Sequence, residues 1–340
     1  MSRTVAVLGA TGLVGRTMLA VLEERDFPLD HLLPLASDRG ADRALPWRGR
    51  PVPVEPVGEA SFEGVELALF AGGNPVSERW APVATAAGAR VVDNSSAFRY
   101  QDDIPLVVPE INGERLLERP LLVANPNCST IAIVMALAPL ARAAGLERVV
   151  VSTYQSVSGA GSEALADLES GVRAGLDGPP PARHGGKPPF AFNVVPQIDR
   201  FEENGYTREE MKVVWETRKI LDLPGLPVTA TAVRVPVRIG HGAAVTAEFR
   251  RALEPEEARE LWAAFPGVEV MDDPARGVFP TPLAAAGRDA VLVGRARRDL
   301  SHPGGLSFFV CADNLRKGAA LNAVQIAEKL CGVAARAESR

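Results

Sequence analysis

The stretch TVAVLGATGLVGR, residues 4–16, decides the fold. Its first part, TVAVLGA, is short, apolar and rich in valine, which predicts a buried strand. Apolar residues at helical spacing follow from Leu13 onward. Gly9, Gly12 and Gly15 stand at this junction, where they would let the backbone approach a pyrophosphate at the amide end of a helix. Because the glycines follow a strand and open a helix, the sequence favours a dinucleotide-binding site over a merely tight turn.

The same rhythm of strand and helix continues through the first third of the chain. Further short apolar runs, each ending in a polar loop, lie at 32–37, 66–73 and 89–96, and a helical segment lies at 77–88. Strands that alternate with helices predict a parallel, doubly wound sheet. We therefore expect a Rossmann-type α/β domain here.

The pattern changes after Cys128. The strands expected in this part are longer and more alternating, and they lie at 147–159, 228–241, 243–253, 290–299 and 305–314. Such strands predict a mixed or antiparallel sheet, and therefore a second, α+β domain. The segment 314–330 has the spacing of an amphipathic helix, whereas 177–189 is a loop rich in proline and glycine.

Bulk composition narrows the class of protein. A chain of 340 residues is long enough for two domains or one large one. The formal net charge of −5 offers no basic surface for nucleic acid or membranes. No apolar run approaches the roughly 20 residues of a membrane span, and the N-terminal stretch does not resemble a signal peptide. The 3 cysteines fit a reducing cytoplasm better than a disulfide framework, and with the 4 histidines they show no metal-ligand spacing.

The loop after the second expected strand should distinguish NADP from NAD. It reads ASDRGADR, residues 36–43. Ser37 and Arg39 could hold a 2′-phosphate, which favours NADP. Asp38 could instead accept a hydrogen bond from a ribose 2′-hydroxyl, which favours NAD. We expect NADP and leave NAD open because of Asp38.

Cys128 is the candidate nucleophile. It stands in VANPNCST, residues 123–130, just before an apolar helical run. A cysteine in the first turn of a helix gains thiolate character from the positive end of the helix dipole, and the same amides can bind an oxyanion. A buried structural cysteine is the alternative. Cys311 and Cys331 lie in apolar segments, so we assign them to packing.

Several charged residues are candidates for proton transfer or ligand binding. His241 lies between glycines in RIGHG, where an imidazole could transfer protons near neutral pH, and an exposed loop histidine is the alternative. Arg234 would face away from His241 on a continuous strand, so a bulge or loop is needed to bring them together. Arg99, and Glu209 with Lys212 at i, i+3, are candidate ligands of charged groups, although the last two could be an ordinary surface ion pair.

Taken together, these segments resemble the aspartate-semialdehyde dehydrogenases over nearly the whole chain. The motifs that carry the resemblance are GATGLVG, FAGGNPVS, VVDNSSAFR, VPEIN, NPNCST, YQSVSGAG, AFNVVPQID, EEMK, RVPVRIGHG and DNLRKGAALNAVQIAE. One such motif is weak support, whereas this many in the same order are not expected by chance.

The resemblance implies a role for each candidate. Cys128 would be the nucleophile, His241 the acid/base, and Gln155 would orient the substrate carbonyl. Substrate groups would be bound by Arg234 (α-carboxylate), Glu209 (amino group), and Arg99 and Lys212 (phosphate). The cofactor would contact Gly9, Thr11, Gly12, Leu13, Val14, Gly15, Ser37, Arg39, Gly40, Ser158, Gly159 and Asn314.

The resemblance also implies a reaction and an assembly. The reaction is the NADPH-dependent, reversible reduction of L-aspartyl-4-phosphate to L-aspartate 4-semialdehyde and phosphate, through a thioester on Cys128. It belongs to the biosynthesis of lysine (through diaminopimelate), threonine and methionine. The protein would be a cytoplasmic homodimer. Residues 1–127 would bind the dinucleotide, 128–313 would form the catalytic and dimerisation domain, and 314–340 would return to the first domain.

Three alternatives to this interpretation are two related enzymes and a non-catalytic protein. N-acetyl-γ-glutamyl-phosphate reductase uses the same chemistry, but its cysteine motif is closer to Asn-Pro-Gly-Cys, and its acylated substrate has no ammonium for Glu209 to meet. Glyceraldehyde-phosphate dehydrogenase typically has Ser-Cys-Thr-Thr around its nucleophile. A non-catalytic NADP-binding sensor could lose Cys128 or His241, and both are present.

Overall fold

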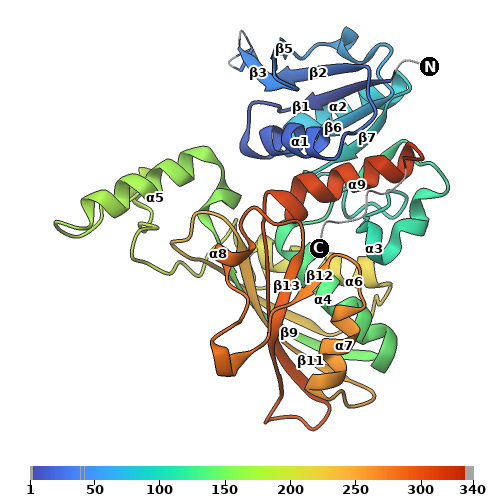
Figure 1. The fold of residues 1–340 in the computed structure, drawn as a ribbon. Helices are drawn as coiled ribbons and strands as arrows, with labels where there is room; N and C mark the ends of the chain where they lie inside the picture. Colours follow the sequence, from blue (N-terminus) through green and yellow to red (C-terminus); the bar gives the residue numbers. More distant parts are fainter. Residues whose placement is uncertain (1–2, 39, 42, 334–340) are drawn as a thin grey trace. The chain divides into compact units, whose positions relative to one another are not determined.

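The computed structural model describes residues 3–38, 40–41 and 43–333. The chain forms two compact units, Met1–Asn127 with Ala319–Arg340 and Cys128–Gly318. Each unit is built around its own sheet (Figure 1).

The first unit contains a parallel sheet with the strand order β5-β2-β1-β6-β7-β8. Its strands are β1 (Thr4–Leu8), β2 (His31–Ala36), β5 (Glu55–Pro56), β6 (Leu67–Phe70), β7 (Arg90–Asp93) and β8 (Leu122–Ala124). An antiparallel ribbon of β3 (Ala44–Trp47) and β4 (Arg50–Pro53) follows β2 in the chain. The expected Rossmann-type domain is confirmed.

Helices cover both faces of this sheet (Figure 1). They are α1 (Leu13–Glu24), α2 (Asn74–Ala86) and α9 (Leu321–Leu330), and the short helix α3 (Pro109–Asn112) packs against α9. Val5 and Val7 of β1 pack in one core with α1 and α9, whereas Ala6 and Leu8 pack in another core with α2. Successive strand residues point to opposite faces, so a strand covered on both sides is apolar on both, as residues 5–8 (VAVL) are.

The second unit contains a mixed sheet with the strand order β10-β9-β11-β14-β13-β12, as expected. Its strands are β9 (Leu146–Gln155), β10 (Val228–Arg234), β11 (His241–Phe249), β12 (Val268–Val270), β13 (Val291–Arg298) and β14 (Gly305–Ala312). Strand β10 runs parallel to β9 and β12 parallel to β13, while the other pairings are antiparallel.

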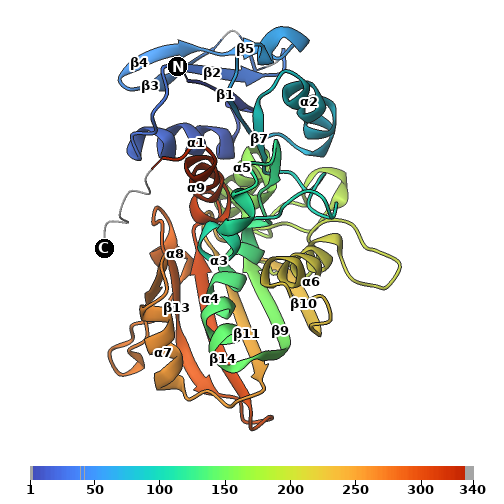
Figure 2. The same ribbon diagram turned by 90° about the vertical axis from the view of Figure 1, so that its right-hand side faces the viewer.

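The helices of the second unit position its functional residues. They are α4 (Cys128–Ala144), α5 (Ser162–Ala174), α6 (Arg208–Leu221), α7 (Pro255–Ala263) and α8 (Pro282–Ala285). Helix α4 packs on β9, β11 and β14 and contacts α6 and α7 (Figure 2). Because neighbours surround it, α4 is apolar on nearly all sides. Helix α5 lies away from the sheet and has a small core of its own, which includes Val157, Leu168 and Phe190.

Two predicted elements differ from the structure. The segment 228–241 is not one strand, because β10 ends at Arg234 and β11 begins at His241. Pro236 has no N–H for a ladder, and Gly240 has a φ of 92°, so the chain leaves the sheet between them. The final helix does not begin at 314, because a π-helical turn over Arg316–Ala320 precedes α9.

Candidate active site

The turn between β1 and α1 has the shape that a pyrophosphate requires. Gly9 has a φ of 84°, and a Cβ on Gly15 would lie 2.2 Å from the Gly9 carbonyl oxygen. Gly12 is the N-cap of α1, and it provides no side-chain cap for the amides of the first turn. Thr11, Leu13 and Val14 complete this turn. The residues therefore fit a dinucleotide phosphate bound by main-chain amides.

A second turn follows β2. Ser37 and Asp38 are exposed, and the Gly40 amide donates to the Ser37 carbonyl over 2.7 Å. A Cβ on Gly40 would lie 3.1 Å from the Thr11 hydroxyl oxygen, so the absence of a side chain brings the two turns together. Arg39 lies outside the described residues.

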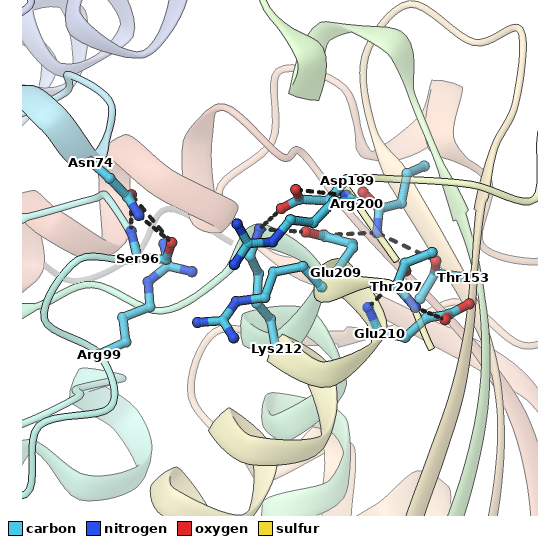
Figure 3. A network of polar contacts seen from close by, with 12 residues as sticks. Asn74, Ser96, Arg99, Thr153, Asp199, Arg200, Thr207, Glu209, Glu210 and Lys212 are labelled. Carbon is cyan, nitrogen blue, oxygen red and sulfur yellow. Dashed lines mark hydrogen bonds and ion pairs between the residues drawn. The ribbon is translucent and has the colours of Figure 1, made fainter. Parts of the chain in front are cut away.

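Arg99 lies in the loop after β7, in the first unit. It is 5% exposed, and its Nη2 donates to the Asn94 carbonyl over 2.7 Å. In the same loop, the Ser96 amide donates to Asn74 Oδ1 at the start of α2 over 3.0 Å (Figure 3). These bonds hold the loop that carries the guanidinium.

Cys128 is the first residue of α4, as expected for a cysteine at the positive end of a helix. Its side chain is partly buried, and a Cβ on Gly318 would lie 3.0 Å from the Cys128 Cβ. Cys311 and Cys331 form no disulfide. Burial raises the pKa of Cys311 to about 12 and raises that of Cys331, which fits the packing role expected for both.

The sheet brings Gln155, Arg234 and His241 to one edge. Strand β9 ends at Gln155, which is in register with Arg234 at the end of β10, and β11 begins with His241 on the other side of β9. Arg234 Nη1 donates to the Ser156 carbonyl over 2.7 Å, and the Ser156 amide donates to His241 Nδ1 over 3.0 Å. His241 is only 3% exposed, so it is not a solvent-exposed loop histidine.

Burial and charge set the protonation of this group. Burial, with a further contribution from the Arg234 guanidinium, lowers the pKa of His241 to about 3. Burial also lowers the pKa of Arg234, while the charges of Glu209 and Cys128 oppose this. A Cβ on Gly159 would lie 3.1 Å from Arg234 Nη1 and 3.2 Å from His241 Nε2. The absence of a side chain at Gly159 therefore leaves space next to both nitrogens.

A capping box fixes the start of α6. Thr207 is the N-cap, and its side chain accepts from the Glu210 amide over 3.3 Å. The Glu210 carboxylate accepts from the Thr207 amide over 2.6 Å and from the Ala232 amide of β10 over 2.9 Å. Of the two adjacent glutamates, Glu210 is thus structural, and it aligns Glu209 with the site.

Glu209 connects two of the other predicted site residues. Its Oε1 accepts from Gln155 Nε2 over 3.1 Å, and its Oε2 accepts from Lys212 Nζ over 3.0 Å. Lys212 also donates to Asp199 Oδ2 over 2.9 Å (Figure 3). Burial alone would lower the pKa of Lys212, but the carboxylates outweigh it and raise the pKa. The Glu209 and Lys212 side chains are 6% and 14% exposed, so they do not form an ordinary surface ion pair.

Asn314 follows β14 and joins the loops at this edge. Its Oδ1 accepts from the Gly240 amide over 2.8 Å and from Ser156 Oγ over 3.0 Å, and its Nδ2 donates to Ser158 Oγ over 3.0 Å. Ser158 lies in a 3-10 turn that directly follows the end of β9.

The sequence motifs assign no role to Ser156, Asp199 or Glu210. Ser156 and Asp199 lie inside the motifs YQSVSGAG and AFNVVPQID, which gave a signal for the segment but not for the residue. For Glu210, the spacing of Thr207 and Glu210 matches a capping box and could have been recognised.

Two further observations concern metal binding and membrane spans. Among the described residues, no group of three or more His, Cys, Asp or Glu side chains could hold a metal ion. In the same part of the chain, no helix is both long and apolar enough to span a membrane.

The chain matches two family models of the semialdehyde dehydrogenases. The NAD binding domain matches residues 4–119, and the dimerisation domain matches residues 137–317. The two units thus define a semialdehyde dehydrogenase, an enzyme with one domain for a nicotinamide cofactor and one for dimerisation.

Named relatives narrow the class further. An aspartate-semialdehyde dehydrogenase of Legionella pneumophila is 51% identical over 97% of this chain and 96% of the relative. One from Bacillus subtilis is 47% identical over 96% of each. The crystal structure of aspartate semialdehyde dehydrogenase II from Vibrio cholerae, complexed with ASA, is similar to this chain with a TM-score of 0.94 and 47% sequence identity. The match covers 98% of this chain and 99% of that chain. The chain belongs to the aspartate-semialdehyde dehydrogenase family of oxidoreductases.

Proposed function

We propose that the protein reduces L-aspartyl-4-phosphate to L-aspartate 4-semialdehyde and phosphate, with NADPH as the reductant. The observation that carries the proposal is a group of side chains at one end of the strands of the second sheet. Hydrogen bonds connect Gln155 with Glu209, and Arg234 with the Ser156 carbonyl next to His241. Cys128 belongs to this group, because its charge raises the pKa of Arg234 against the effect of burial. This group offers a nucleophile, a carboxylate ligand and an ammonium ligand, as the substrate requires.

Substrate recognition rests on opposite charges. Arg234 can bind the α-carboxylate through two parallel hydrogen bonds, because a guanidinium presents its donors in a planar fork. Glu209 can bind the ammonium, and Gln155, which is hydrogen bonded to Glu209, can orient the reacting carbonyl. Lys212 and Arg99 are the proposed ligands of the phosphate.

Cys128 would act as the nucleophile. At the start of α4 its thiolate is stabilised by the helix dipole, and attack on the acyl phosphate forms a C–S bond while the C–O bond to phosphate breaks. NADPH, when bound, supplies the hydride that reduces the resulting thioester. The amides of the first turn of α4 can stabilise negative charge on the carbonyl oxygen.

The cofactor would bind the turns after β1 and β2. Its pyrophosphate would meet the glycine turn, while Ser37 and Gly40, together with Arg39, would surround the 2′-phosphate of the adenosine ribose. Ser158, Gly159 and Asn314 are proposed to contact the cofactor from the second unit. Asp38 leaves NAD as a second cofactor.

The remaining assignments concern assembly and location. Residues 1–127 would form the dinucleotide-binding domain, 128–313 the catalytic and dimerisation domain, and 314–340 the segment that returns to the first domain. The protein would be a homodimer, as the family description of residues 137–317 suggests. We propose the cytoplasm as its location, because a nucleophilic thiol needs a reducing compartment.

The decisive experiment measures the reduction of the nicotinamide cofactor while L-aspartate β-semialdehyde is oxidised. The purified full-length protein is assayed with NADP or NAD, with and without inorganic phosphate. We expect phosphate-dependent reduction of NADP. If the N-acetylglutamate semialdehyde works and the aspartate semialdehyde does not, the proposed substrate is wrong.

A variant pair tests the phosphate ligand. Lys212→Met should raise the KM for phosphate by about tenfold or more, because one charge-assisted contact contributes roughly 1.5–3 kcal/mol. Lys187→Met, at an exposed position of the 177–189 loop, is the control and should leave this KM unchanged. Equal values of the phosphate KM in the two variants would remove Lys212 from the phosphate site.

A further inference from the structure

Asp199 is a charged residue beside the candidate active site that the proposed mechanism does not use. Its Oδ2 accepts from Lys212 Nζ over 2.9 Å, and its Oδ1 accepts from the Arg200 amide over 2.9 Å (Figure 3). Lys212 also donates to Glu209, which is more deeply buried. The Asp199 side chain is 38% exposed, so it is the more exposed of the two carboxylates that contact the lysine.

The backbone is held in place on both sides of Asp199. Before it, Val195 exchanges two main-chain hydrogen bonds with Arg234 at the end of β10, each 2.9 Å long. After it, the Arg200 carbonyl accepts from the Arg208 amide at the start of α6 over 2.7 Å. The segment thus runs from the proposed carboxylate ligand to the helix that carries the lysine, and the position of the Asp199 carboxylate is defined by both.

Asp199 itself has a left-handed backbone conformation, with a φ of 69°. Apart from glycine, aspartate and asparagine adopt this conformation most readily, because their short side chains can bond to the local backbone. The hydrogen bond from the Arg200 amide is of this kind. The backbone therefore favours Asp or Asn at this position, and Asp199→Asn removes the charge while it suits the same conformation.

The contact between Asp199 and Lys212 is an ion pair. Burial alone would raise the pKa of Asp199, but the hydrogen bonds from Lys212 and the Arg200 amide outweigh burial and lower the pKa. Burial opposes the charge of Lys212, yet the charge of Glu209 and the hydrogen bond to Asp199 raise its pKa. Each group therefore favours the charged form of the other.

The two carboxylates also fix the direction of the ammonium. A lysine ammonium has three N–H donors. Asp199 and Glu209 accept from two of those on Lys212, and the third has no partner among the described residues. The side chain would otherwise rotate about its flexible four-carbon stem. The third donor is the one that remains for a phosphate oxygen.

Glu209 has two cations to serve when the proposed substrate is bound. Its Oε2 accepts from Lys212, and the substrate brings an ammonium to the same carboxylate. Two ammonium groups on one carboxylate repel each other and share a single negative charge. Asp199 supplies a second negative charge, so that each cation has an anion of its own.

We propose that Asp199 is the counter-ion of Lys212 and a positioning residue for substrate binding, because it leaves the charge of Glu209 to the ammonium of the substrate. This inference rests on the proposed function. Asp199 acts through the lysine and the glutamate. Without its charge, Lys212 would turn to Glu209 and compete there with the substrate ammonium.

The first test examines the ion pair without any substrate. Full-length wild type and Asp199→Asn are labelled with trace acetic anhydride over a series of pH values, and mass spectrometry compares Lys212 with the exposed Lys187 in the same sample. We expect the pH profile of Lys212 acetylation to move to lower pH in Asp199→Asn, because a charge that favours the ammonium is lost. Glu202→Gln, in the same segment, is the control and should not move the profile. An unmoved profile in Asp199→Asn would overturn the ion pair.

Steady-state kinetics then test the role in substrate binding. We expect Asp199→Asn to raise the KM for L-aspartate β-semialdehyde about tenfold, the usual effect of one charge-assisted contact. The kcat and the Kd for NADP should stay within about twofold, because the lost interaction concerns binding and not the chemical step. Glu202→Gln removes a negative charge from the same segment and should leave this KM unchanged. Equal KM values in wild type and Asp199→Asn would refute the proposal.

A double substitution separates this role from a structural one. In the Lys212→Met background no lysine competes for Glu209, so adding Asp199→Asn should change the KM for the semialdehyde by less than about twofold. An equal rise in both backgrounds would mean that Asp199 acts on the fold of its segment, which would refute the proposal. If the wild type does not turn over the semialdehyde, the proposed function fails, and the role in substrate binding fails with it. The acetylation profile would still show whether Asp199 is the counter-ion of Lys212.

Discussion

Acid should destabilise the folded protein through His241. The pKa of this residue is about 3 in the folded protein against 6.5 for the free side chain, so below pH 6.5 the unfolded chain binds a proton that the folded chain excludes. The stabilising contribution of the neutral ring is therefore complete above pH 6.5 and is lost as pH falls toward 3. Between pH 7 and pH 5, linkage for one such group lowers the free energy of unfolding by about 2 kcal/mol.

The measurement compares wild type with His241→Gln, because Gln does not titrate. Urea unfolding at pH 7 and pH 5, at one protein concentration, gives the fall in the free energy of unfolding for each protein. We expect this fall to be about 2 kcal/mol larger in wild type than in the variant. His31→Gln, at an exposed position, is the control and should behave as wild type. The reasoning is refuted if wild type and His241→Gln lose the same free energy between the two pH values.

Two glycine substitutions test close approaches in the two units. Gly15→Ala would place a Cβ 2.2 Å from a backbone oxygen, and overpacking of about 1–3 kcal/mol should weaken NADP binding about 5- to 150-fold, as measured by fluorescence titration. Gly58→Ala, where a Cβ meets nothing closer than 4.0 Å, should leave the NADP affinity unchanged, and equal affinities in the two variants would contradict the role of the turn. Gly318→Ala would place a Cβ 3.0 Å from the Cβ of Cys128 and should lower kcat by about tenfold or more while the urea midpoint changes little. An unchanged kcat would show that the nucleophile tolerates the shift.

The first domain could be predicted from sequence because its signals are local. Each buried strand is a short apolar run, and the turn after β1 needs glycines that are visible in the sequence. The division between β10 and β11 was less accessible, because apolar residues continue to alternate through RVPVRI even though Pro236 cannot join a ladder. The start of α9 was missed for a similar reason, since the bonds between Asp313 and the amides that follow it are not visible in an amphipathic pattern.

The site residues could be proposed by type, but their partners could not. Gln155 and Glu209 are 54 positions apart, and Arg234 and Ser156 are 78 positions apart, so only the folded sheet brings them together. The hydrogen bond that His241 Nδ1 accepts comes from the main-chain amide of Ser156, which carries no sequence signal at all. A sequence motif therefore identifies which residues act, whereas the hydrogen bonds of the folded chain decide what each of them can do.

The charge balance of the site explains why an amino acid with a free ammonium suits it. The positive charges of Arg234 and Lys212 equal in number the negative charges of Glu209 and Asp199. These linked side chains therefore carry no net charge. A substrate that brings both a carboxylate and an ammonium adds one partner to Arg234 and one to Glu209 and keeps this part of the site balanced. An N-acylated substrate brings the carboxylate without the ammonium, which leaves a buried negative charge without a new partner. Since an uncompensated buried charge is costly, we expect the residues proposed to bind the aspartyl group to exclude its acylated analogue.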